Sequence, residues 1–333
     1  MKNGIIDNDI DFVILWVDSN DPEWLAARQH YAREETGFNN RNECRFRDWG
    51  TLRYWFRSVE RYALWVRKIH FVTYGHYPEW LNLEHPKLHF VKHEDFVPQE
   101  YLPTFSCNPL ELNLHHIDGL ANQFVYFNDD MFVFAPVRPT DFFVNGLPCD
   151  CAIRNFPLLG DIGHTNMNDI NLINKRFYFR KQFKQNFWKW NHPKYGLRCL
   201  QNLLFLPWGD FTGAVNTHVA NSYTKESYKQ VWEVFGEELH ETCTHKFRTP
   251  ANVNQWLIKY WQLVSGDFHP RQIYFGKYYL IDNLSDWEKD LKKKRHSLVC
   301  LNDNGECADI SELKEKVNRI FEEEFPEKCS YEK

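Results

Sequence analysis

Apolar and polar positions alternate in blocks along the first half of the chain. The stretch from Asp11 to Val17 is apolar after its first residue, which is typical of a strand buried on both faces of a parallel sheet. Three further apolar runs predict strands at 68–74, 87–92 and 123–127. Apolar residues at helical spacing predict helices between them, at 22–33, 49–62 and 108–120. This alternation predicts an α/β fold with a Rossmann-like, doubly wound sheet.

The second half of the chain is richer in predicted helices. Two are predicted at 223–239 and 252–263, and a C-terminal helix opens at Asp309 with a capping box. A strand beginning near Val299 is predicted to end in a polar turn at 302–304. There is no internal repeat or flexible linker, so independent domains are not expected. We divide the chain into an α/β half at 9–150, an insert at 151–210 and a C-terminal part at 211–333.

The insert has an unusual composition. Between Lys175 and Arg198 lie eight Lys or Arg residues and eight aromatic residues, with no Asp or Glu. This segment predicts a helical, cationic and aromatic flap. Three interpretations stay open from the sequence: a solvated amphipathic helix over the core, a flap that binds an acceptor substrate, and a peripheral contact with a membrane surface.

Charge and hydropathy narrow the class of protein. The formal net charge of -5 argues against a nucleic-acid partner, because such proteins neutralise many phosphates. The nine cysteines are odd in number and scattered, which argues against a disulfide framework. No apolar run is long enough to span a bilayer, and residues 1–11 lack the apolar segment of a secretory signal. We therefore expect a cytoplasmic location. The sequence leaves the oligomeric state open.

Two predicted strands end in acidic turns, at 18–21 and at 128–130. The adjacent carboxylates of Asp129 and Asp130 repel each other unless a cation compensates them, and Mg²⁺ or Mn²⁺ bridging a diphosphate is the simplest candidate. The competing interpretation is a helix cap beside a surface acid. Asp18 and Asp21 could hold the base and ribose of a nucleoside, or could only cap the following helix.

Several basic residues suit the binding of a phosphate-bearing ligand. Arg47, Arg53 and Arg57 offer planar donors for phosphate, although surface ion pairs would explain them equally well. His218 follows a Gly-containing turn and is a candidate general base, and Arg248 is a candidate clamp on a reacting phosphate. His116 fits a half-buried structural histidine.

Four blocks of the sequence, in this order, resemble the Stealth family. That family includes bacterial capsular-polysaccharide phosphotransferases and the catalytic subunit of the animal lysosomal-enzyme N-acetylglucosamine-1-phosphotransferase. The blocks cover residues 10–22, 45–143, 218–248 and 300–303. They contain Ile10-Asp-Phe-Val-Ile-Leu-Trp-Val-Asp18, Arg45-Phe-Arg-Asp48, Leu102-Pro-Thr-Phe105, Asn128-Asp-Asp-Met131 and Cys300-Leu-Asn-Asp303.

The resemblance implies a nucleotide-sugar-binding core of the GT-A-like kind and transfer of a sugar 1-phosphate. An acceptor hydroxyl of a glycan attacks the β-phosphorus of a nucleotide sugar, and nucleoside monophosphate departs. The implied metal ligands are Asp129 and Asp130, with Mg²⁺ or Mn²⁺ as the cofactor. The implied catalytic residues are His218, Arg248 and Asp130. The implied donor-binding residues are Asp18, Asp21, Arg47, Arg53, Arg57, His115 and Asn302, and Glu111 is expected to orient His115.

Two other functions stay open. An ordinary glycosyltransferase would use the same metal site but would release nucleoside diphosphate. A carbohydrate-binding protein without activity would explain the many aromatic residues (13 Trp, 16 Tyr and 27 Phe). Most of these lie in predicted strands and on apolar helix faces, however, and a binding module has no need for paired acids at a strand end.

Overall fold

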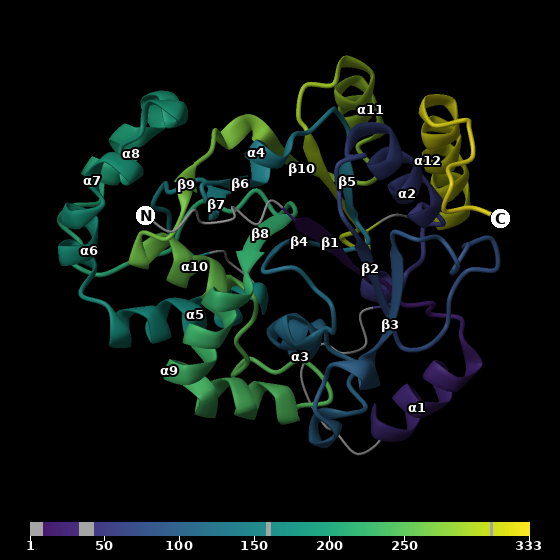
Figure 1. Ribbon diagram of the computed structural model, residues 1–333, viewed down its shortest axis with the longest axis horizontal. Helices are drawn as coiled ribbons and strands as arrows, with labels where there is room; N and C mark the ends of the chain where they lie inside the picture. Colours follow the sequence, from purple (N-terminus) through teal and green to yellow (C-terminus); the bar gives the residue numbers. More distant parts are fainter. Residues whose placement is uncertain (1–8, 33–42, 158–160, 307–308) are drawn as a thin grey trace, which may run out of the picture.

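The computed structural model describes residues 9–32, 43–157, 161–306 and 309–333 (Figure 1). Its central sheet has five strands in the order β3-β2-β1-β4-β8. They are β3 (Leu88–Lys92), β2 (Ile69–Thr73), β1 (Ile10–Leu15), β4 (Gln123–Phe127) and β8 (Asn221–Thr224). The first four are parallel, and β8 runs antiparallel to β4. The predicted α/β class with a Rossmann-like core is confirmed.

Two smaller sheets join distant parts of the chain. One has the order β10-β11-β5 and the other β6-β7-β9. Their strands are β5 (Met131–Val133), β6 (Phe143–Val144), β7 (Leu147–Asp150), β9 (His269–Pro270), β10 (Gly276–Leu280) and β11 (Leu298–Asn302). Together with β8, strands from the C-terminal part therefore complete all three sheets begun in the first half. The predicted division at 150 and 210 separates parts that share one framework.

The helices of the first half are α1 (Pro22–Ala32), α2 (Leu52–Tyr62), α3 (Cys107–Asn113) and α4 (Pro139–Phe142). The insert supplies α5 (Asp161–Arg176), α6 (Phe179–Gln185), α7 (Phe187–Trp190) and α8 (Cys199–Leu204). The C-terminal part supplies α9 (Lys225–Thr244), α10 (Trp256–Ser265), α11 (Leu284–Lys293) and α12 (Ile310–Glu324). Within the described residues, no helix is long and apolar enough to cross a membrane.

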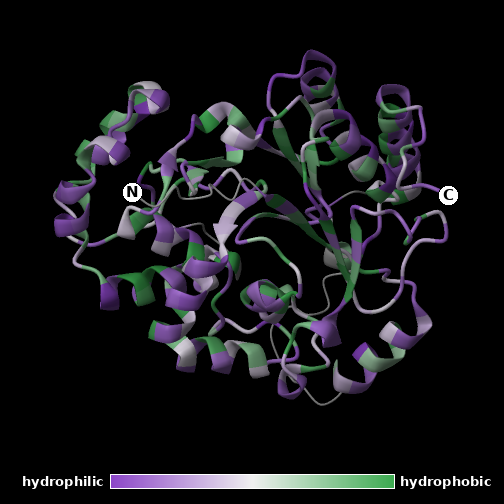
Figure 2. Ribbon diagram, in the orientation of Figure 1, coloured by the Kyte–Doolittle hydropathy of each residue, from purple (hydrophilic) through white to green (hydrophobic). Residues whose placement is uncertain are grey.

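The central sheet is covered on both faces, which explains its continuous apolar strands. Along β1, Phe12 and Ile14 point into a core shared with α2, α11 and α12. Val13 and Leu15 point into the opposite core, shared with α3, α9 and α10. Side chains alternate between the two faces of a strand, so a strand buried on both faces carries apolar residues at every position. Figure 2 shows these strands in green at the centre of the molecule.

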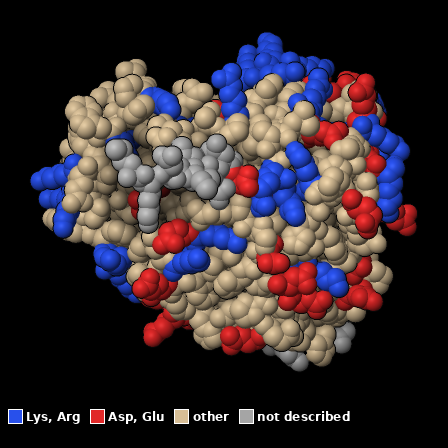
Figure 3. Space-filling model, in the orientation of Figure 1, with Lys and Arg blue, Asp and Glu red and all other residues tan. Residues whose placement is uncertain are grey.

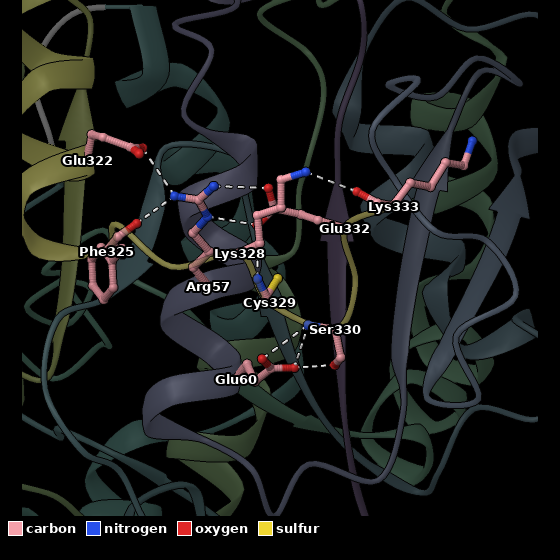
Figure 4. Close-up of polar contacts among 9 residues, drawn as sticks. All are labelled: Arg57, Glu60, Glu322, Phe325, Lys328, Cys329, Ser330, Glu332 and Lys333. Carbon is pink, nitrogen blue, oxygen red and sulfur yellow. Dashed lines mark hydrogen bonds and ion pairs between the residues drawn. The ribbon is translucent and has the colours of Figure 1, made fainter.

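Arg57, predicted to contact a donor, is instead part of a buried ion-pair cluster that holds the C-terminus (Figure 4). Its guanidinium donates to both carboxylate oxygens of Glu332, at 2.7 and 3.0 Å, and to the carbonyl oxygen of Phe325 at 2.6 Å. Glu322 of α12 accepts a further bond at 3.1 Å. These acids come from the far end of the chain, so inspection of the sequence around Arg57 could not reveal them.

Arg57→Ala is expected to lower the free energy of unfolding by about 3–5 kcal/mol, because it leaves Glu332 buried without its partner. Urea unfolding of the full chain measures this loss. Arg61→Ala is the control, because Arg61 pairs with Glu324 but is 47% exposed, and we expect a loss below about 1 kcal/mol. Equal losses in both variants would contradict the assignment of a buried anchor to Arg57.

Candidate active site

A cavity of about 780 Å³ opens at the carboxyl ends of β1 and β4. Trp16 and Val17 follow β1, and the Asn128–Asp130 turn follows β4. The start of α3, the turn after β11 and the segments around His218 and Arg248 complete its wall. Ligands of open α/β sheets bind at this edge, because the strand ends and the helix N-termini converge there.

The paired acids lie on this wall. The Oδ2 atom of Asp130 accepts a hydrogen bond from the Cys300 thiol at 3.2 Å, while its buried Oδ1 atom has no partner among the described residues. Asp129 lines the cavity and is exposed to it. Loss of hydration, followed by the charges of Asp130 and Asp48, raises the pKa of Asp129 to about 8. Burial also raises the pKa of Asp130, against the effect of His218. Both shifts indicate a place for a cation.

Asp130, His218 and Cys300 each offer a ligand atom, and these atoms lie within 4.8 Å of one another. Burial and the charge of Asp130 raise the pKa of the Cys300 thiol well above its usual value, so the sulfur stays protonated. The available donors are thus carboxylate oxygens and an imidazole nitrogen. Oxygen donors suit Mg²⁺ and Mn²⁺, and an imidazole ligand suits Mn²⁺ better than Mg²⁺. The residues therefore fit the predicted divalent cation.

His218 is held in an uncommon backbone conformation. Its φ is 48°, in the left-handed region, and its N–H donates to the Oδ1 atom of Asn216 at 2.8 Å. The rings of Trp256 and Tyr278 lie about it, with centroids at 6.3 and 6.1 Å. A non-glycine residue in this conformation is held there by its surroundings, and such residues cluster at functional sites. The ring is thereby fixed next to Asp130.

Arg248 reaches the cavity from the segment after α9. Its Nη2 atom donates to the Cys107 sulfur at 2.7 Å. Burial raises the pKa of the Cys107 thiol to about 12, so the sulfur carries no charge at neutral pH. Among the described residues, no carboxylate lies within 4.0 Å of the Arg248 guanidinium. The buried carboxylate of Glu111 acts on this guanidinium from farther away, so the positive charge of Arg248 is only partly compensated and is available to a ligand.

Arg47 and Asn302 also line the cavity. Arg47 donates to Asp303 at 2.5 Å, which ties the segment before α2 to the turn after β11. Since Asp303 neutralises it, Arg47 offers a ligand less net charge than Arg248 does. Six of the predicted site residues line this one cavity, and these are Arg47, Asp129, Asp130, His218, Arg248 and Asn302.

The other predicted donor-binding residues do not line this cavity. The Oδ1 atom of Asp21 accepts from the N–H of Trp24 at 2.7 Å, as a cap of α1, and Asp18 accepts from Asn20 at 2.9 Å within its own turn. Arg53 lies over the ring of Trp80 at 5.5 Å. His115 packs against His116 and Tyr228, and burial lowers its pKa to about 3.

Glu111 has a different partner from the one predicted. Its Oε1 atom accepts from the Tyr126 hydroxyl at 3.0 Å, and that hydroxyl also contacts the side chain of Asn128. Glu111 and Cys107 therefore connect α3 to the acidic turn and to Arg248. The cavity wall also contains residues to which the sequence assigned no role, and these are Cys107, Asn216, Trp256, Tyr278 and Asp303. Of these, Cys107 and Asp303 lie in blocks that carry the family resemblance, but the resemblance gave neither of them a role.

Two family models match this chain in the regions of the first two blocks. Conserved region 2 of the Stealth proteins matches residues 45–149, and conserved region 1 matches residues 8–35. A crystal structure of the galactosyltransferase LgtC with donor and acceptor sugar analogues is similar with a TM-score of 0.43, at 10% identity over 94% of this chain and 95% of that one.

Several relatives match over nearly their full length. The capsular polysaccharide phosphotransferase WcwK of Streptococcus pneumoniae is 42% identical, over 97% of this chain and 98% of the relative. The exopolysaccharide phosphotransferase cps2G of Lactiplantibacillus plantarum is 36% identical, over 98% and 96%. The receptor polysaccharide phosphotransferase WefC of Streptococcus oralis is 35% identical, over 98% and 99%. The chain therefore belongs to the Stealth family, together with these capsular and exopolysaccharide phosphotransferases.

Proposed function

We propose that this protein transfers a sugar 1-phosphate from a nucleotide diphosphate sugar to a glycan hydroxyl, in the synthesis of a capsular, exocellular or lipopolysaccharide glycan. The observation that carries the proposal is the presence, in one cavity, of a carboxylate oxygen of Asp130 without a described partner and of the Arg248 guanidinium, which forms no ion pair with a described carboxylate. A cation beside a diphosphate satisfies the first, and a phosphate oxygen satisfies the second. The full-length phosphotransferase relatives support the same reaction.

The proposed reaction balances in one displacement. The acceptor oxygen forms a bond to the β-phosphorus, and the bond from that phosphorus to the bridging oxygen breaks. Nucleoside monophosphate leaves with the bridging oxygen, and the sugar keeps its bond to phosphate. Phosphoryl transfer of this kind depends on positioning and on neutralising the phosphate oxygens more than on covalent catalysis.

Each cavity residue has a proposed role. Asp129 and Asp130 would hold Mg²⁺ or Mn²⁺, which when bound neutralises the diphosphate. Arg248 binds an oxygen of the reacting phosphate, with Arg47 and Asn302 orienting the donor. His218 takes the proton of the acceptor hydroxyl. Asp18 directly follows Val17, which lines the cavity, so a role of Asp18 in donor binding stays part of the proposal.

Analysis of the released nucleotide tests the proposal. The protein is incubated with Mn²⁺ or Mg²⁺, a panel of UDP-, GDP- and CMP-sugars and glycan acceptors. Monophosphate from a diphospho-sugar, with a phosphodiester in the product, is the expected result. Release of UDP or GDP would establish ordinary glycosyl transfer at the same metal site. Sugar binding that is independent of metal and gives no turnover with any donor would favour a carbohydrate-binding protein.

His218→Gln is expected to lower kcat about 100-fold or more and to remove the acidic limb of the pH–rate profile, since general bases contribute about 100–10,000-fold. Its position beside Asp130 offers a second role as a metal ligand. A titration of activity with Mn²⁺ separates the two. An unchanged metal requirement supports the base, whereas full recovery at high Mn²⁺ assigns His218 to the metal.

A cytoplasmic location and peripheral contact with the membrane are also part of the proposal. The cationic, aromatic composition of the insert supports the membrane contact.

A further inference from the structure

Three helices of the insert form an arm at the left edge of Figure 1. The arm comprises residues 177–208 and includes α6, α7 and α8. Buried Arg154, which precedes the insert helices in the chain, holds the arm against the rest of the protein. The Arg154 guanidinium donates to the carbonyl oxygens of Phe205 at 2.7 Å and Asp210 at 2.6 Å, and it lies over the rings of Phe179 and Phe205. The arm is therefore fixed in place by polar contacts on its inner side.

The polarity of α8 is the reverse of that of a helix covering a core. Its inner side is polar: buried Asn202 donates to the carbonyl oxygen of Ala152 at 2.8 Å, and Gln201 donates to that of Arg154 at 2.7 Å. Its leucines and those of the flanking turns point outward, with exposed fractions of 86% for Leu197, 52% for Leu200, 39% for Leu203, 73% for Leu204 and 44% for Leu206. A solvated amphipathic helix has the opposite arrangement.

Exposed apolar side chains gather on this arm. Of the fifteen large hydrophobic side chains exposed in the described residues, eight belong to residues 177–208. Besides the five leucines, they are Tyr178, Trp188 and Trp208, of which Trp188 is 78% exposed. Apolar residues exposed singly are ordinary on a protein surface, but a group of this density marks an interaction site.

Positive charge surrounds the same residues. The segment 175–209 has eight Lys or Arg and no acidic residue, although the whole chain carries a net charge of -5. All of these cations except Lys189 are exposed. Lys181 and Lys184 of α6 form no ion pair with any described acid. Figure 3 shows Lys and Arg at the left edge, where α6 lies.

The positive charge of the arm distinguishes between two possible partners, a second copy of the chain and a lipid bilayer. A symmetric contact between two copies through this arm would bring the same cations together, which repels. A bilayer with anionic headgroups matches both features, because leucine and tryptophan enter the boundary of the acyl region while lysine and arginine bind the headgroups. We propose that residues 177–208 dock the protein on an anionic membrane surface. This deepens the membrane contact named under the proposed function, but binding can be measured without turnover.

A second, small cavity has lining residues both from the arm and from the candidate active site. Its volume is about 70 Å³, and Arg198 of the arm lines it together with Phe156. Asn216 and Trp256 line both this cavity and the larger one. Asn216 also accepts a hydrogen bond from the backbone N–H of His218, so the proposed base lies near the residues that the two cavities share.

Flotation of the full chain with vesicles tests the docking surface. We expect the protein to float with phosphatidylcholine vesicles that contain phosphatidylglycerol, and not with phosphatidylcholine alone. Raising the salt from about 0.05 to about 0.5 M should release it, because the screening length falls. The variants Lys181→Gln/Lys184→Gln and Leu197→Ser/Leu204→Ser should each weaken binding by at least about tenfold. All four side chains are exposed, so folding should be kept, and thermal melts check this.

Matched variants elsewhere control for general effects. Lys292→Gln/Lys293→Gln on α11 removes the same charge, and Leu64→Ser removes a leucine that is 69% exposed. Both should bind vesicles as the wild type does. Absence of flotation, or equal loss in the control variants, would overturn the proposal. A dimer seen by light scattering and abolished by Leu197→Ser/Leu204→Ser, without vesicle binding, would assign the arm to a second copy and overturn it as well.

Discussion

Asp129→Asn is expected to lower kcat about 1000-fold while leaving the metal-free protein at least as stable as the wild type. A cation on this carboxylate contributes several kcal/mol of charge stabilisation, and about 4 kcal/mol corresponds to 1000-fold in rate. Without the cation, the charge of Asp129 is unfavourable in the folded chain, since loss of hydration and the charges of Asp130 and Asp48 raise its pKa to about 8. Removing that charge therefore removes a source of instability.

The pH dependence of stability has a definite sign. Between the unfolded pKa near 4 and the folded value of about 8, native Asp129 keeps a proton that the unfolded chain has lost. The free energy of unfolding of the metal-free wild type should therefore decrease as pH rises through this window, relative to Asp129→Asn. Because Asp129 is open to the cavity, the difference should be modest.

Three measurements check this expectation: turnover, thermal unfolding in EDTA from pH 5 to pH 8, and thermal unfolding with Mn²⁺ added. Mn²⁺ should raise the melting temperature of the wild type and change that of Asp129→Asn much less, because only a bound cation stabilises the native state. Asp118→Asn is the control, since Asp118 is an exposed acid outside the cavity. Full activity and an unchanged response of Asp129→Asn to Mn²⁺ would remove Asp129 from the metal site.

Periodicity predicted the central sheet well, because strands buried on both faces leave an unambiguous apolar run. The predicted strands at 11–17, 68–74, 87–92 and 123–127 all appear, within two residues at each end. The helix predicted at 223–239 was partly wrong, since residues 221–224 form β8 before α9 begins. That short strand is the antiparallel edge of the sheet, and four residues are too few to show a period.

The sequence predicted the position of a site residue only where that residue directly follows a strand of the central sheet. Asp129 and Asp130 follow a strand of the central sheet, so they had to lie at its carboxyl edge. The partner of an arginine is decided by distant packing instead. Arg57 and Arg248 look alike in the sequence, yet Glu332 neutralises the first and no described carboxylate within 4.0 Å neutralises the second. The outward-facing leucines of α8 could not be predicted for the same reason. Which side of α8 faces inward depends on its contacts with Arg154, which lies far away in the sequence.

Arg248→Ala is expected to lower kcat by about 100–1000-fold, the usual effect of removing one donor that stabilises developing charge. The guanidinium has a neutral sulfur as its described hydrogen-bond partner, so its positive charge is directed to the ligand. The loss of stability should be smaller than for Arg57→Ala, because no described carboxylate forms an ion pair with Arg248 and the nearby Glu111 keeps its hydrogen bond from Tyr126. Affinity for the nucleoside monophosphate product should change less than kcat, if Arg248 binds the phosphate that stays with the sugar.

Arg248→Lys separates charge from geometry. Lysine keeps the positive charge but not the planar pair of donors, so we expect partial recovery, with kcat between those of the alanine variant and the wild type. Arg53→Ala is the matched control, because Arg53 was an equally good candidate in the sequence but lies over Trp80 outside the cavity. It should keep turnover close to that of the wild type. If Arg53→Ala lost as much activity as Arg248→Ala, the donor phosphates would have to bind nearer to α2, and the cavity assignment of Arg248 would be wrong.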